Sequence, residues 1–161
     1  ITEQRFLELC KSLLGKKAQS EMKKLTLLPP KSHDKSSSNL IESWNEGERN
    51  LRLALSKVRA DKMKKPPQTQ DDFLPTELIK VANAAVEMDN PLKAEKFLNR
   101  YRLEFLETLR PSDTFAEDFI YYYGLKLKLL LYIKQFNTEL GEAAYKNIYN
   151  SILNGDRLEA I

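Results

Sequence analysis

Apolar side chains recur at helical spacing through most of this chain, and this periodicity limits the folds that it can adopt. Phe97, Leu98 and Tyr101, for example, lie three or four positions apart, as residues on one face of an α-helix do. No sustained alternation of apolar and polar residues with turn chemistry predicts a β-strand. We therefore expect an all-α fold of about six helices, packed as antiparallel hairpins in an irregular bundle or a helical repeat.

Capping residues and prolines mark the ends of the expected helices. The patterned stretches, of which the second is short, run over residues 2–14, 20–28, 38–63, 75–88, 90–109, 114–136 and 139–153. Asn90 suits an N-cap and Pro91 the first helical position after it. Thr114 and Glu117 have the spacing of a capping box. Gly15 is expected to cap the end of the first helix.

Three residues of the N-terminal part predict details of packing. Cys10 and Trp44 lie on apolar stripes, so we expect both side chains in the core. Gly47 stands inside a long helical pattern, where glycine is otherwise unfavourable. It predicts either close packing against a neighbouring helix or a kink.

The chain divides by charge and by a proline-broken stretch, although its length suggests a single helical domain over residues 1–161. Its expected parts are a basic N-terminal helical part (1–63), a polar linker (64–74) and a C-terminal four-helix part (75–155). Residues 1–70 hold 15 Lys or Arg against 8 Asp or Glu, whereas residues 71–161 hold 11 against 15. The basic front half and the mildly acidic back half therefore either pack together or serve different partners.

No constellation of residues predicts catalysis, metal binding or a cofactor site. The chain has one cysteine and one histidine, His33, so a metal site lacks ligands and a nucleophile lacks a base. The five glycines are isolated, unlike those of a phosphate-binding loop. The adjacent carboxylates Asp71 and Asp72 stand near a helix start, where they favourably meet the helix dipole. We expect no enzyme activity and no cofactor.

The sequence also predicts an intracellular protein, in the cytoplasm or the nucleus, without a membrane span. A single cysteine cannot form an internal disulfide framework and fits a reducing compartment. No stretch approaches the roughly 18 apolar residues that a spanning helix requires. Because the chain begins at Ile1 rather than at a methionine, we expect it to be a piece of a longer protein.

One stretch, residues 78–101, resembles a tetratricopeptide repeat, a family of stacked helical hairpins. The matching positions are Leu78, Val81, Ala82 and Ala85 in the first helix, Asp89 and Asn90 at the turn, and Ala94, Leu98 and Tyr101 in the second helix. Small residues such as Ala82 let two helix backbones approach closely, while larger residues fill the groove beside them. Pro91 departs from the family pattern, in which an apolar side chain is usual. The resemblance implies a helical repeat, and an irregular bundle remains the alternative.

Tyr121, Tyr122 and Tyr123 are the candidate partner-binding residues. Three consecutive residues of a helix point about 100° apart, so they cannot all face one core. At least one must meet another helix, a partner or solvent, and core packing on several sides is the alternative explanation. Tyrosine is favoured at protein interfaces because it combines apolar area with a hydrogen-bonding end.

A group of basic residues near the end of the third expected helix is a candidate site for nucleic acid or an acidic partner. It comprises Lys57, Arg59, Lys62, Lys64 and Lys65. Such groups contact phosphates with little sequence preference. The set is interrupted by an acidic residue, and no aromatic side chain lies among its members to stack on bases. A solvated helix face is therefore the alternative.

Together these features predict a non-catalytic helical protein–protein interaction domain, a scaffold or adaptor part of a larger intracellular multiprotein complex. In such architectures a groove between helices commonly binds a peptide or a partner helix. The alternative function is binding of an RNA or DNA backbone through the basic N-terminal half.

Overall fold

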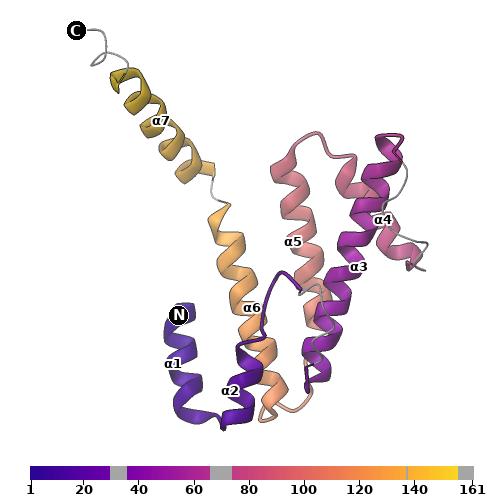
Figure 1. Cartoon of the computed structure of the whole chain (residues 1–161), viewed down its shortest axis with the longest axis vertical. Helices are drawn as coiled ribbons and strands as arrows, with labels where there is room; N and C mark the ends of the chain where they lie inside the picture. The colour runs from indigo at the N-terminus through magenta and orange to yellow at the C-terminus, as the bar shows by residue number, and fades with distance from the viewer. Residues whose placement is uncertain (30–35, 66–73, 137, 156–161) are drawn as a thin grey trace. The chain divides into compact units, whose positions relative to one another are not determined.

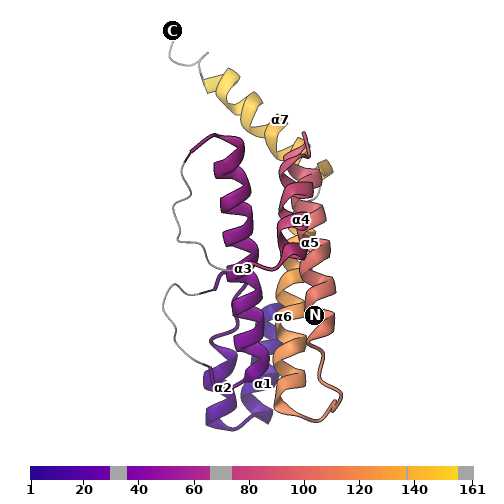
Figure 2. The same ribbon diagram turned by 90° about the vertical axis from the view of Figure 1, so that its right-hand side faces the viewer.

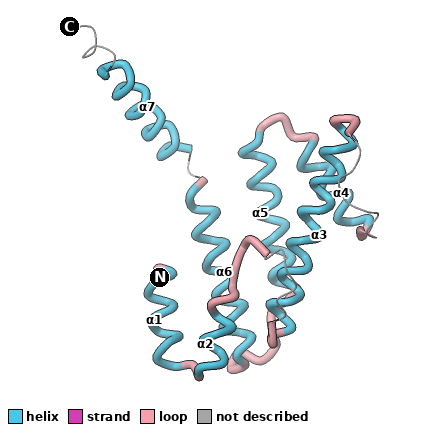
Figure 3. Tube along the Cα trace, viewed as in Figure 1, coloured by secondary structure: helices cyan, strands magenta, loops and turns pink. Residues whose placement is uncertain are grey.

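The computed structural model describes residues 1–29, 36–65, 74–136 and 138–155, and all of their regular secondary structure is helical (Figures 1 and 3). The helices are α1 (Glu3–Leu13), α2 (Lys16–Met22), α3 (Asn39–Lys62), α4 (Thr76–Val86), α5 (Pro91–Thr108), α6 (Glu117–Gln135) and α7 (Thr138–Gly155). The prediction of an all-α fold is confirmed. The described residues contain seven helices, where about six were expected.

The chain forms two compact units, Ile1–Leu130 and Leu131–Ile161, so their boundary falls inside α6. The predicted division at residues 64–74 stays a prediction, because residues 66–73, among them Asp71 and Asp72, lie outside the described residues. None of the helices described in either unit is both long and apolar enough to cross a membrane.

Two helix starts form as the sequence predicts. The Asn90 side chain accepts hydrogen bonds from the backbone N–H groups of Leu92, at 2.9 Å, and Lys93, at 3.3 Å, and Pro91 occupies the first turn of α5. At the start of α3, the Ser38 hydroxyl accepts from the Ile41 N–H at 3.3 Å. Each cap satisfies backbone donors that have no partner within the helix.

Two predicted helix boundaries are wrong at the N-terminal end of the chain. Gly15 does not cap α1: its backbone is extended, with φ −66°, and it is the N-cap of α2. The second helix therefore covers Lys16–Met22 rather than residues 20–28. The physical reason is Gln19, whose side-chain amide donates to the backbone oxygens of Lys11, at 3.0 Å, and Leu14, at 2.8 Å. Gln19 thus binds free carbonyl groups at the end of α1, which favours a second helix that starts directly after the first.

The capping box predicted at Thr114 is also wrong. Helix α6 begins at Glu117, and the residues before it form a turn in which the Asp113 carboxylate accepts the Phe115 N–H at 2.8 Å. An aspartate side chain that binds the backbone two residues on favours a turn over a helix start. Phe115 is left 97% exposed.

The core of the first unit lies where α3, α4 and α5 meet. Its buried members are Leu51, Ala54, Leu55 and Val58 from α3, Leu78, Ala82 and Ala85 from α4, and Leu98 from α5. Helix α4 packs chiefly against α3 and also against α5 (Figures 1 and 2). Ala54 and Ala82 are fully buried, which lets the helix backbones approach closely.

The packing predictions for Cys10, Trp44 and Gly47 are confirmed. Cys10 is buried, and burial raises the pKa of its thiol. Trp44 is fully buried, and its indole N–H donates to the Thr26 carbonyl at 3.0 Å. A Cβ atom at Gly47 would lie 2.3 Å from the Phe105 ring, so the glycine permits close contact between α3 and α5.

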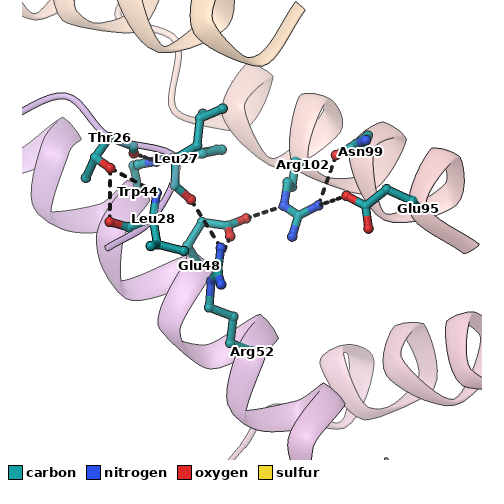
Figure 4. Close-up of polar contacts among 9 residues, drawn as sticks. All are labelled: Thr26, Leu27, Leu28, Trp44, Glu48, Arg52, Glu95, Asn99 and Arg102. Carbon is teal, nitrogen blue, oxygen red and sulfur yellow. Dashed lines mark hydrogen bonds and ion pairs between the residues drawn. The ribbon is translucent and has the colours of Figure 1, made fainter. Parts of the chain in front are cut away.

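A buried ion pair joins α3 to α5 (Figure 4). The Glu48 side chain is 2% exposed, and one of its carboxylate oxygens accepts from Arg102 Nε at 2.7 Å. Arg102 Nη1 also donates to Asn99, at 2.9 Å, and to Glu95, at 3.3 Å. The second Glu48 oxygen lies 3.5 Å from Nε of Arg52, whose Nη2 donates to the Leu27 carbonyl at 3.3 Å. The network thus ties both helices to the chain segment before α3.

Replacing Arg102 by leucine should lower the free energy of unfolding by about 3 kcal/mol, because the buried Glu48 charge loses its closest partner. Urea denaturation followed by circular dichroism measures the change. The double variant Glu48→Leu/Arg102→Leu should recover most of the loss, since no buried charge is then left unpaired. A single variant as stable as the wild type would show that the ion pair does not hold the helices together.

Candidate functional site

Helix α6 turns the three predicted tyrosines in different directions. Tyr121 and Tyr122 are 2% and 3% exposed, whereas Tyr123 is 43% exposed. They therefore do not form one continuous patch, and each has a different set of neighbours.

Tyr121 belongs to the interior near the start of α6. Its hydroxyl lies 3.5 Å from a carboxylate oxygen of Glu117. Burial, followed by the nearby charges of Glu117, Glu21 and Asp118, raises the pKa of Tyr121 to about 12. Asp118 in turn accepts a hydrogen bond from the Ser38 hydroxyl at 2.7 Å, which joins the starts of α6 and α3. This tyrosine is a structural residue.

Tyr122 faces α5 through a polar cluster. Its hydroxyl donates to Glu107 Oε1 at 2.8 Å, and Lys126 Nζ donates to the same carboxylate oxygen. Lys126 Nζ also lies 3.1 Å from the Tyr122 hydroxyl. Hydrogen bonds from Lys126 and then from Tyr122 hold the pKa of Glu107 below its usual range, while Glu107 raises the pKa of Lys126. Both groups stay charged and neutralise each other.

A groove of about 270 Å³ opens beside this cluster on the surface of α6. Its lining residues are Arg110, Phe119, Tyr122, Tyr123, Lys126, Leu127 and Leu130. Those from α6 fall at positions 119, 122, 123, 126, 127 and 130, the spacing of one helix face. The groove therefore follows the helix for about three turns, or about 16 Å at about 1.5 Å per residue.

The groove changes in character along α6. Near the start of the helix, the Arg110 guanidinium lies 5.9 Å from the centroid of the Phe119 ring, and Lys126 lies 5.5 Å from that of Tyr122. Toward the other end the lining is aliphatic, and Leu130 is 47% exposed. Such a groove can hold a ligand that is anionic at one end and apolar at the other.

Of the candidate tyrosines, only Tyr122 and Tyr123 line the groove. Tyr123 also packs against Phe6 of α1, with ring centroids 5.3 Å apart. The sequence prediction did not include the other lining residues. Phe119, Lys126 and Leu130 repeat at helical spacing from the tyrosines, and this was the signal that could have located them.

A second apolar surface lies on α7, in the other unit. Side chains at positions 145, 148, 149 and 152 share one helix face, and the described side chains from 141 to 153 are all exposed. Tyr145 and Tyr149 lie with ring centroids 6.0 Å apart, and Ile148 is 61% exposed. An amphipathic face of this kind suits contact with another protein surface.

The predicted basic residues lie at the end of α3. Arg59, Lys62, Lys64 and Lys65 are exposed and Lys57 is half-buried. Lys62 Nζ donates to the Val86 carbonyl at the end of α4, at 3.1 Å, so one member of the set serves a structural contact. Lys64 has a positive φ of 53°, where the chain leaves the helix.

Among the described residues, no three His, Cys, Asp or Glu side chains lie close enough together to bind a metal ion. His33 lies outside the described residues. No known protein family model matches the chain, and no curated protein or solved structure resembles it significantly. The site must therefore be understood from its own geometry.

Replacing Tyr121 by phenylalanine should remove from an alkaline absorbance titration a tyrosine that ionises at about pH 12. The pKa of this group is about 12 in the folded protein, against 10.0 for an unperturbed tyrosine. Between pH 10 and 12 the unfolded chain binds fewer protons at this tyrosine than the folded chain does. The free energy of unfolding of the wild type therefore falls as pH rises through this range. The stability difference between wild type and Tyr121→Phe should therefore shift in favour of the variant from pH 10 to 12.

The same substitution at Tyr123 is the control, because that side chain is exposed on the same helix. A variant at position 121 whose titration matches the wild type would contradict the structural role of Tyr121.

Proposed function

We propose that this chain is a non-catalytic protein–protein interaction domain, acting as a scaffold or adaptor part of a larger intracellular multiprotein complex. The observation that carries the proposal is the groove on α6. Its side chains Tyr123 and Leu130 are exposed, although they repeat at the helical spacing that is typical of core residues. Exposed apolar side chains that gather in a groove favour a bound partner, because burying them removes apolar area from water.

The shape of the groove favours a peptide or a helix as the partner. Its α6 lining forms a stripe at helical spacing, which is the form of surface that accepts an amphipathic helix. The exposed stripe of α7 is a second surface of the same kind. Two such surfaces in one chain suit an adaptor, which must hold more than one protein.

The titratable groups of the groove favour binding over catalysis. Glu107 and Lys126 form an ion pair, and both are held in their charged forms. A general acid or base needs a pKa near the working pH, and this pairing moves both groups away from it. Their geometry serves to fix Tyr122 and the edge of the groove.

The packing of α4 and α5 supports a tetratricopeptide-like hairpin as part of this domain. The two helices contact each other, and Ala82, Ala85 and Leu98 share one buried cluster with the half-buried Val81 and Tyr101. These are positions at which the sequence resembles the repeat. We propose that the hairpin acts as the rigid support on which the α6 groove is presented.

Leu130→Glu should abolish capture of the partner, because a charge would replace an apolar side chain that the partner buries. Capture is measured by chemical crosslinking of the full chain in an extract of the source organism, followed by mass spectrometry. The partner should crosslink to wild type but not to the variant, and the variant should melt within a few degrees of wild type.

Leu13→Glu is the matched control, since Leu13 is 80% exposed on α1 and does not line the groove. It carries the same chemical change and should keep the partner. If both variants, or neither, lose their crosslinked partners, the groove is not the docking site.

The second candidate function is binding of an RNA or DNA backbone by the basic residues near the end of α3. It is favoured by the exposure of Arg59, Lys64 and Lys65 on one short stretch. Phosphate contacts release counterions, so affinity should fall steeply as salt rises. We would titrate a single-stranded RNA and a duplex DNA at two salt concentrations, with Lys64→Glu/Lys65→Glu as the variant. Affinity that is indifferent to salt or to these substitutions would rule out this function.

A further inference from the structure

We propose that the groove on α6 binds an acidic amphipathic helix, with a carboxylate of the partner on Arg110 and its apolar side chains along the groove toward Leu130. This inference rests on the proposed interaction function and adds the chemistry of the partner. It follows from the charge of one end of the groove, the apolar lining of the other, and the length between them.

Arg110 is the available cation of the groove. Lys126 already donates to Glu107 and to the Tyr122 hydroxyl, so its charge is neutralised within the domain. Within the part of the chain that the structure describes, no carboxylate forms an ion pair with Arg110, whose side chain is exposed at the end of α5. The charge of Arg110 also helps to lower the pKa of Glu107, after the larger effect of Lys126. Two cations and one carboxylate leave a net positive charge at the polar end of the groove, and a carboxylate of the partner is its complement.

The position of Arg110 suits a carboxylate in particular. Its guanidinium lies 5.9 Å from the centroid of the Phe119 ring. A guanidinium beside an aromatic face keeps N–H donors along its edge, and these can bind both oxygens of one carboxylate. A lysine at this place would offer only a point charge.

The other end of the groove selects against a ligand that is charged along its whole length. Tyr123, Leu127 and Leu130 supply apolar area over the last two turns of the groove. A nucleic-acid strand would place successive phosphates beside these side chains, where the one lining cation, Lys126, is already paired with Glu107. An amphipathic helix instead buries apolar groups there.

The spacing of the lining residues sets the pattern of the partner. The groove spans positions 119 to 130, about three helical turns. A partner helix of the same length has apolar residues at i, i+4 and i+7, with its acidic residues about one turn before the first of them. This order places the acidic turn beside Arg110 and the apolar turns beside Leu127 and Leu130.

The test uses fluorescein-labelled, alanine-based peptides of about four turns. Each has leucine at i, i+4 and i+7, and the peptides differ only in carrying two glutamates, two glutamines or two lysines in the turn before. Fluorescence anisotropy with the full chain at low salt measures their affinities. We expect the glutamate peptide to bind about tenfold more tightly than the glutamine peptide, as a charge-assisted hydrogen bond allows.

Arg110→Glu should reverse the preference, so that the lysine peptide binds more tightly than the glutamate peptide. Arg100→Glu is the matched control on the same helix, because its side chain is 81% exposed and pairs with Glu104 rather than lining the groove. The control should keep the wild-type order. Leu130→Gln should weaken the glutamate and glutamine peptides by the same factor.

The proposal is overturned if no peptide binds, if the glutamate and glutamine peptides bind equally, or if Arg110→Glu leaves the order unchanged. It is also overturned if single-stranded polyuridylate displaces the glutamate peptide, which would assign the groove to phosphates. If the glutamate and glutamine peptides bind wild type equally and neither binds Leu130→Gln, the preference for an acidic partner is ruled out. The proposed interaction function would still stand. The crosslinking experiment decides that function independently.

Discussion

The arrangement of the first unit depends on a carboxylate that must be satisfied out of water. Glu48 is 2% exposed on α3, and its closest partner, Arg102, comes from α5. Because a buried charge without a partner is costly, the two helices are held where these groups meet. Next to the pair, Gly47 removes the side chain that would otherwise collide with Phe105. The ion pair thus attracts α3 and α5 to each other, and the glycine leaves the space that this contact needs.

Once α5 is fixed, one edge of the groove follows. Glu107 and Arg110 lie at the end of α5. The Glu107 carboxylate accepts hydrogen bonds from the Tyr122 hydroxyl and from Lys126, both on α6. On another side, α6 contacts α1, where Lys128 forms an ion pair with Glu3 and Phe6 packs on Tyr123. These contacts set the rotation of α6 about its axis. The side chains of Leu127 and Leu130 then line an open face.

The sequence predicted the helices far better than their contacts. Helical spacing located the helices closely except for α2, and the burial of Trp44 followed from its place on an apolar stripe. Glu48 stands on that same stripe, four residues after Trp44, and its polarity concealed its burial. Its partner lies 54 residues further along the chain, and local periodicity cannot detect such a pairing. Helix starts were wrong where side chains such as Gln19 and Asp113 bind backbone groups, since these bonds compete with propensity.

The tyrosines show why a run of residues on one helix predicts a site only in part. Successive positions are turned by about 100°, so Tyr121 enters the interior, Tyr122 meets α5 and Tyr123 borders the groove. Helix α6 is apolar on most sides, and the faces that carry Tyr121 and Tyr122 are buried. The stripe through Tyr123, Leu127 and Leu130 is also apolar, but its side chains are less buried than those of Tyr121 and Tyr122. Because one helix carries both faces, we expect a change at its buried face to act on stability and a change at Leu130 to act on the proposed partner.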